Sequence, residues 1–120
     1  MATWYQQFYD DIDNLRMEEY LAAQTEDATV VVGNGPKVMG RQQIRAGIGG
    51  FWGKIGGLRH RFFNVIESGD FTVLEAHIDY TRKDGRVVTV PCTTVLKRRD
   101  SLISETRIYI DLAPVFAPAS

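Results

Sequence analysis

The second half of the sequence constrains the fold most, because long alternating runs are separated there by short turn signals. Three dipeptides typical of tight turns divide residues 58–111 into four segments: Ser68-Gly69, Asp84-Gly85 and Asp100-Ser101. Asp-Gly between alternating segments is a strong hairpin signal. We therefore expect four consecutive antiparallel strands over residues 58–67, 70–82, 86–99 and 102–111.

The first half of the chain has helical spacing. Apolar residues recur every three to four positions after Thr3, a residue type that often caps helices. A second short helix is expected over about residues 17–25, and a third from residue 40 to about residue 55. Between them lies a short β-branched strand at 28–32, followed by the turn signal at 33–36. The proline-containing tail, residues 112–120, is expected to form a loop or short turn.

Length and charge set the class of protein. A chain of 120 residues with 44% hydrophobic and 24% charged residues is expected to form one domain over residues 1–120. The net charge of −1 and the absence of a Lys/Arg block argue against nucleic-acid binding. One cysteine, Cys92, rules out a disulfide framework within one chain. No signal peptide and no membrane-spanning run is present in the sequence, so we expect a cytoplasmic protein that does not bind membranes.

Turn length predicts which side chains share a face of the sheet. If each hairpin has the two-residue turn named above, the strand register follows. Most of the ionisable candidates then lie on one face. The rows on that face are Leu58, Asp79, Val90, Asp111; then His60, His77, Cys92, Tyr109; then Phe62, Glu75, Thr94, Arg107.

The opposite face is expected to be apolar. It would carry Phe63, Val65, Leu74, Ala76, Ile78, Tyr80, Val95, Ile108 and Ile110. Three helices cover one face only, so we expect this second, convex face to form a homodimer. Pro91 lies mid-strand and lacks a donor for the ladder, and a β-bulge there would shift the register.

The order helix, helix, strand, turn, helix and four-strand meander resembles the nuclear transport factor 2-like (cystatin-like) fold, and within it the SnoaL-like branch. The similar segments are residues 26–30, 40–45, 80–86 and 103–111. The resemblance covers nearly the whole chain and implies an α+β domain. In that fold a cone-shaped, curved mixed sheet carries the three N-terminal helices on its concave face. The fold hosts isomerases, cyclases, dehydratases, epoxide hydrolases and non-enzymatic binders, so it does not specify a reaction.

The resemblance also implies site residues. Limonene-1,2-epoxide hydrolase has acids similar in position to Asp79 and Asp111, but His77 stands in place of its arginine. SnoaL-type polyketide cyclases use an acid–base aspartate similar to Asp111. Steroid isomerases of this fold have a base where this chain has Val32, which argues against their mechanism.

We expect Asp79 and Asp111 to act as an acid–base pair with His77. Two strand spacings place their backbones about 9–10 Å apart, and two nearby carboxylates in an apolar pocket have diverging pKa values. Together, His60, His77 and Asp79 also form a possible two-His-one-carboxylate metal set. We nevertheless expect no metal and no cofactor. The expected substrate-binding residues are His60, Tyr109, Phe62, Trp52, Tyr20 and Val90.

These expectations lead to one main hypothesis and two alternatives. The main hypothesis is a cofactor-free enzyme that carries out acid–base chemistry on a small hydrophobic, oxygenated molecule. The alternatives are a non-catalytic ligand-binding or dimerisation module, and an epoxide hydrolase.

Overall fold

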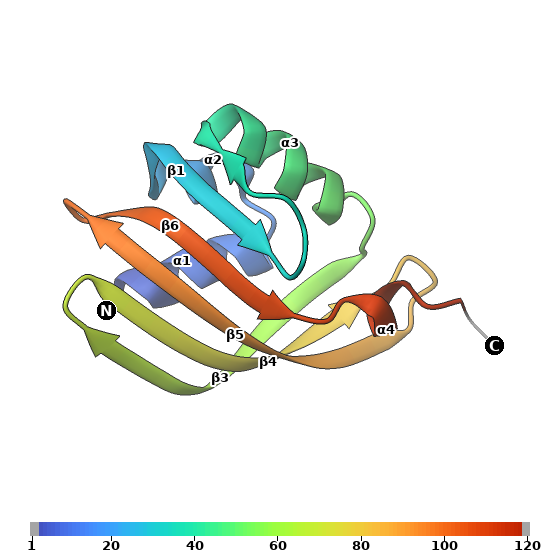
Figure 1. Cartoon of the computed structure of the whole chain (residues 1–120). Coiled ribbons are helices and arrows are strands. Elements are labelled where there is room, and N and C mark those ends of the chain that lie inside the picture. Colours follow the sequence, from blue (N-terminus) through green and yellow to red (C-terminus); the bar gives the residue numbers. More distant parts are fainter. Residues whose placement is uncertain (1–2, 119–120) are drawn as a thin grey trace.

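A computed structural model describes residues 3–118 of the chain. It contains one mixed six-stranded sheet, in the order β2-β1-β6-β5-β4-β3, which curves around helices packed on one of its faces (Figure 1). We call the face toward the helices the inner face and the opposite one the outer face. The elements are α1 (Trp4–Asp13), α2 (Met17–Ala22), β1 (Gln24–Val32), β2 (Val38–Met39), α3 (Gly40–Trp52), β3 (Gly57–Ser68), β4 (Phe71–Thr81), β5 (Val87–Arg99), β6 (Leu102–Ile110) and α4 (Ala113–Phe116).

The predicted α+β fold is confirmed, and so is the predicted cap of the first helix. Thr3 accepts a hydrogen bond from the backbone N–H of Gln6, and the Gln6 side chain accepts one from the backbone N–H of Thr3. This reciprocal pair satisfies two donors that a helix start leaves without partners.

The second helix is shorter than predicted. It ends at Ala22, and the chain is already extended from Gln24 onward. The reason is parallel pairing with β6, in which Gln24 lies opposite Ile103 and the Ile103 N–H donates to the carbonyl of Ala23 over 2.9 Å. A contact between residues so far apart in the chain leaves no local pattern, so the helix–strand boundary was misplaced.

The hairpin between β4 and β5 has a longer loop than predicted. The N–H of Arg82 donates to the carbonyl of Arg86 over 2.8 Å, which leaves a three-residue loop over residues 83–85. Gly85 has a φ of +88°, the left-handed conformation that closes such loops. Between β3 and β4 the loop is Gly69-Asp70 rather than Ser68-Gly69. The Asp100-Ser101 turn is confirmed, since Arg99 pairs with Leu102.

The extra loop residue reverses the faces of β4 relative to the predicted rows. Asp79 lies opposite Thr89 instead of Val90, and a one-residue slip moves every side chain to the other face. Several residues expected on the outer face therefore belong to the buried core: Leu74, Ala76, Ile78 and Tyr80.

Pro91 carries no β-bulge. Pro91 lies opposite His77 in a β4–β5 register that runs without a shift. Register shifts occur instead between Phe62 and Asn64 on β3, and between Lys97 and Arg98 on β5. The β3 shift keeps Phe62 and Val65 packed toward the core while Phe63 turns outward and is 60% exposed.

The helices bury the inner face in two adjoining clusters. The larger cluster joins α1, α2 and α3 to β1 and β6, and it includes Phe8, Tyr20, Ile44 and Trp52. The smaller cluster lies where β3, β4 and β5 meet α4, and it includes Leu58, Ile78, Val90 and Val115. Within residues 3–118, no helix is long and apolar enough to cross a membrane.

Candidate functional site

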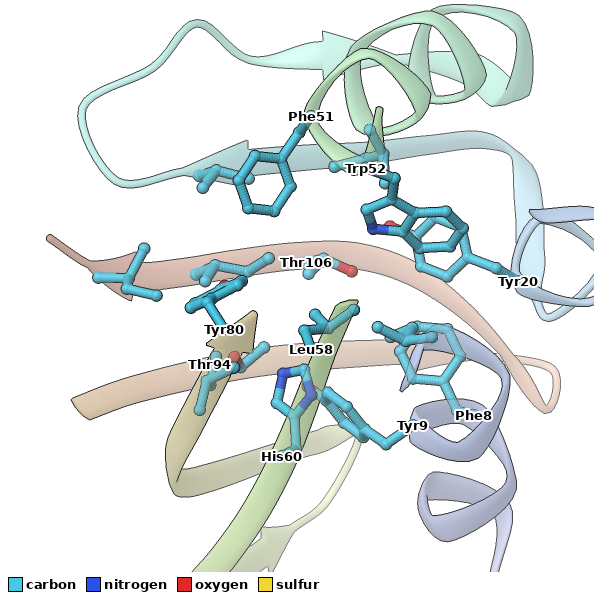
Figure 2. Close-up of a pocket in the computed structure, with 16 residues that line it drawn as sticks. Phe8, Tyr9, Tyr20, Phe51, Trp52, Leu58, His60, Tyr80, Thr94 and Thr106 are labelled. Carbon is cyan, nitrogen blue, oxygen red and sulfur yellow. The ribbon is translucent and has the colours of Figure 1, made fainter. Parts of the chain in front are cut away.

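A pocket lies between the helices and the inner face of the sheet, where the two clusters meet (Figure 2). About 60 Å³ of it can hold the centre of a water molecule, within a space of about 570 Å³ between the atoms that also takes in open solvent. That smaller volume is several times the roughly 10–15 Å³ that one water needs. The lining residues are Phe8, Tyr9, Ile12, Tyr20, Val32, Ile48, Phe51, Trp52, Leu58, His60, Ile78, Tyr80, Thr94, Thr106, Ile108 and Ile110.

The pocket wall is apolar with a few polar atoms. None of the lining residues is Lys, Arg, Asp or Glu, and the polar side chains among them are three tyrosines, two threonines, one tryptophan and His60. Ligand sites commonly combine such a wall with a small number of placed polar groups. The arrangement favours a ligand that is largely apolar and carries no net charge.

His60 is held by Asp13, the last residue of α1. Oδ1 of Asp13 lies 2.6 Å from Nδ1 of the His60 ring, and Oδ2 accepts the backbone N–H of His60 over 2.9 Å. An ionised carboxylate only accepts hydrogen bonds, so the ring proton of neutral His60 resides on Nδ1. Nε2 then carries a lone pair.

Aromatic rings fix the His60 ring in place. The Tyr9 ring centroid lies 4.7 Å from that of His60, and the Phe62 ring is nearly parallel to it at 5.8 Å. The His60 side chain is only 8% exposed. In the described part of the chain no hydrogen bond involves Nε2, so this atom is free to meet a molecule in the pocket that His60 lines.

Three tyrosines supply neutral donors. Burial raises the pKa of Tyr9, Tyr20 and Tyr80 above the usual value of a phenol. In each case loss of hydration of the phenolate is the largest cause. The Tyr9 pKa is partly lowered by a hydrogen bond with Thr94. These hydroxyls therefore remain protonated at physiological pH and can donate to an oxygen in the pocket.

The expected acid Asp79 lies outside this pocket, on the outer face. Its carboxylate pairs with Arg61 in a two-bond arrangement at 2.8 Å and accepts the Thr89 hydroxyl over 2.6 Å. These partners lower the pKa of Asp79 to about 2, with the Arg61 hydrogen bonds as the largest cause. An aspartate held ionised in this way is poorly suited to act as a proton donor.

The other predicted catalytic residues are also outside it. His77 is exposed on the outer face, where its ring lies 5.1 Å from that of Phe63. Asp111 follows β6, is exposed, and accepts the backbone N–H of Ala113 at the start of α4. The expected Asp79–Asp111 pair is therefore not assembled.

The predicted substrate-binding residues divide between the two faces. His60, Tyr20 and Trp52 line the pocket (Figure 2), and their role in substrate binding stays a prediction. The Phe62 ring packs against the rings of His60 and Tyr9 next to the pocket. Val90 is buried in the smaller core cluster. The Tyr109 side chain lies on the outer face and is 59% exposed, so that prediction is wrong.

The possible metal set of His60, His77 and Asp79 is not assembled, because these side chains lie on two different faces of the sheet. His60 pairs with the buried Ile78 of β4 and shares its inner face. Because side chains alternate along a strand, His77 and Asp79 lie on the outer face. Within residues 3–118 no three His, Cys, Asp or Glu side chains are grouped as metal ligands.

Sequence reasoning missed Asp13, Tyr9, Thr94 and Thr106. Asp13 is 47 positions before His60, so only the packing of α1 onto β3 brings the two together. A usable signal was present for the others, because Tyr9 follows the apolar Phe8 within α1, Thr94 lies two residues from Leu96, and Thr106 lies two residues from Ile108.

Comparisons with known proteins agree on the fold. The model of the SnoaL-like domain family matches residues 5–106. An NTF2-like protein of unknown function from Burkholderia pseudomallei K96243 is 18% identical, with 96% of this chain and 95% of that chain covered and a TM-score of 0.87. No protein with a curated description matches the sequence.

Two further solved structures have names that mention an activity. One, provisionally assigned as a SnoaL-like polyketide cyclase from Jannaschia sp. CCS1, is 19% identical over 97% of this chain and 91% of that chain, with a TM-score of 0.82. The other is an LEH-like epoxide hydrolase from M. tuberculosis, which is 16% identical over 94% and 84%, with a TM-score of 0.78. At these identities the likeness is one of fold.

Proposed function

The chain belongs to the SnoaL-like domain family, and on that basis we propose that its pocket binds a small, neutral, largely apolar molecule on which His60 transfers a proton. The observation that carries the proposal is the Asp13–His60 pair at the wall of an otherwise apolar pocket. The proposal replaces the expected pair of aspartates with a histidine that a carboxylate orients.

The neutrality of the ligand follows from the lining. A carboxylate or phosphate buried there would need a cation to compensate for its lost hydration, and the lining contains no Lys or Arg. His60 is already paired with Asp13, so protonation of the ring completes an ion pair within the protein. A ketone, an alcohol or a phenol meets these conditions, and an acid does not.

The chemistry proposed for His60 is general acid–base catalysis. Asp13 fixes the ring so that the Nε2 lone pair can take a proton from a carbon or oxygen of the ligand, and it stabilises the imidazolium that forms. Electrons released from a C–H bond next to a carbonyl move to the carbonyl oxygen. The neutral hydroxyls of Tyr9 and Tyr20 are available to donate to that oxygen.

The alternative function is ligand binding without catalysis. It is favoured by the same apolar wall, since nothing in a binding protein requires the Asp13–His60 pair to change its protonation state. Epoxide opening by two pocket aspartates has no support in the geometry, because Asp79 and Asp111 lie elsewhere.

Deuterium exchange separates catalysis from binding without knowledge of the substrate. Cyclohexanone in D₂O gains deuterium next to its carbonyl when a base removes those protons, and NMR follows the exchange. We expect the protein to accelerate the exchange beyond an equal concentration of free imidazole. His60→Gln should reduce the rate to background.

His77→Gln provides the matched control, because His77 is the only other histidine in the chain and lies on the outer face. This variant should exchange at the wild-type rate. Equal rates for the wild type and His60→Gln would exclude proton transfer by His60. If cyclohexanone still bound in the pocket, the binding function would remain.

A further inference from the structure

Thr106 of β6 has a buried side-chain hydroxyl with no hydrogen-bond partner among the described residues. The residue is 4% exposed and lines the pocket. Figure 2 shows it between the aromatic side chains of α3 and those contributed by β3 and β4. A buried hydroxyl without a partner is costly, so natural structures seldom leave one unsatisfied.

Neighbouring hydroxyls do not resolve this deficit. Thr94 of β5 is a diagonal neighbour on the inner face, because Thr106 lies opposite Leu96 and Thr94 lies two residues away. The Thr94 hydroxyl lies 3.6 Å from Sγ of Cys92, and no hydrogen bond links it to Thr106. Thr106 therefore offers both a donor and an acceptor to whatever occupies the pocket.

Thr106 and His60 belong to different walls. His60 is on β3, at one edge of the sheet, whereas Thr106 is on β6, three strands away in the order β6-β5-β4-β3. Most of the remaining lining is apolar and includes Leu58, Ile78 and Ile108. A ligand that satisfies both polar positions needs an oxygen at each end of an apolar body.

We propose that Thr106 determines ligand specificity by anchoring a second oxygen, a hydroxyl or carbonyl, on a compact apolar ring whose first oxygen meets His60. This inference rests on the pocket of the proposed function, but it does not require that His60 transfers a proton. Thr106 is thus a binding and positioning residue.

Two probes of the same shape test the proposal. Hydroquinone and p-cresol differ in that a hydroxyl of the first is a methyl group in the second. Their affinities are measured under argon by NMR titration for the wild type and for Thr106→Val, which has a methyl group in place of the hydroxyl. One hydrogen bond corresponds to a preference of about threefold to tenfold.

We expect the wild type to bind hydroquinone more tightly than p-cresol by that factor. Thr106→Val should bring the ratio to about one while it keeps or improves the affinity for p-cresol. Thr106→Ser retains the hydroxyl and should restore the preference. Thr72→Val makes the same change at a buried threonine of β4 that does not line the pocket, and it should keep the wild-type ratio.

An unchanged preference in Thr106→Val would overturn the assignment of Thr106, as would an equal loss of affinity for both probes. Either result would be compatible with the proposed pocket and with proton transfer by His60. Failure of both probes to bind the wild type at millimolar concentration would overturn the pocket itself, and the proposed function with it.

Discussion

Asp13 and His60 are joined twice: Oδ1 of Asp13 lies 2.6 Å from Nδ1 of the His60 ring, and Oδ2 lies 2.9 Å from the His60 backbone nitrogen. One carboxylate therefore fixes both the strand and the ring of the histidine. Because Asp13 ends α1 and His60 is on β3, the same contact ties the helix to the edge of the sheet. The orientation of the pocket histidine thus depends on how α1 docks.

The first prediction concerns the tautomer of His60. With ¹⁵N-labelled histidine, the neutral ring should carry its proton on Nδ1, because the Asp13 carboxylate accepts there. Asp13→Asn should shift the ring toward the Nε2-protonated form. The exposed His77 serves as an internal reference in the same spectrum and should not change. An Nε2-protonated His60 in the wild type would contradict the described geometry.

A second prediction follows from the lowered pKa of Asp79. Its folded pKa of about 2 is below its ordinary value of 3.8, so ionised Asp79 stabilises the folded state above about pH 4. That contribution is lost as the pH falls through 2. Asp79→Asn should lower the urea midpoint at pH 7, and the difference from the wild type should shrink between pH 4 and pH 2.

Arg61→Gln tests the cause of that shift. The Arg61 hydrogen bonds are the largest cause of the lowered Asp79 pKa. In Arg61→Gln the urea midpoint should therefore change less between pH 4 and pH 2 than in the wild type. Exchange of cyclohexanone should be unaffected by either variant, because both residues are outside the pocket lining. A large loss of exchange in Asp79→Asn would return Asp79 to the candidate site.

The third prediction compares two glycines at which replacement by alanine should change the free energy of unfolding in opposite directions. Gly85 has a φ of +88°, so Gly85→Ala should lower the free energy of unfolding by about 1–2 kcal/mol. Gly50 lies exposed within α3, and an added Cβ there would meet no atom within 4 Å. Gly50→Ala should therefore raise the free energy of unfolding by up to about 1 kcal/mol. Urea unfolding measures both, and equal signs would contradict the loop or the helix geometry.

The fourth prediction concerns the outer face. Phe63 and Tyr109 are 60% and 59% exposed there, and the Phe63 ring contacts that of His77. We propose that a second copy of the chain covers this face. Phe63→Asp and Tyr109→Asp should each shift the molecular mass in solution toward the monomer, as measured by light scattering. Phe116→Asp changes an exposed aromatic residue of α4 and serves as the control.

Light scattering also shows how the dimer prediction can fail. A wild-type protein that is monomeric at high micromolar concentration would exclude it. The residues first expected to form the interface, among them Leu74 and Ile78, are fully buried under the helices. The proposal therefore depends on the exposed aromatic residues instead.

The sequence was informative where one local pattern decided the outcome. The Thr3 cap, the helical spacing and the four alternating strands depend on contacts within a few residues, and all are present in the structure. The similarity to the SnoaL-like family added the curved sheet and a pocket beneath the helices. Tyr20, Trp52 and His60, predicted to bind substrate, do line that pocket, and the binding itself stays a prediction.

Asp79 and His77 were placed on the wrong face because one loop residue decides the face of β4, and Asp111 because of the register shift between Lys97 and Arg98. With Asp84-Gly85 as the whole turn, Asp79 would share a row with Val90, but the three-residue loop pairs it with Thr89. Since side chains alternate with a period of two, that single residue removed Asp79 and His77 from the pocket while the strands stayed in place.

The sequence by itself thus determined the approximate positions of the helices, the four consecutive strands of the second half and the apolar character of the interior, because these follow from local spacing and composition. Only the tertiary structure decided which polar side chains meet. Asp13 reaches His60 across 47 positions, and the Thr106 hydroxyl, without a partner among residues 3–118, belongs to a residue that lines the same pocket from another strand. Such pairings depend on loop length, sheet curvature and helix docking, which long-range packing sets and which no local pattern records.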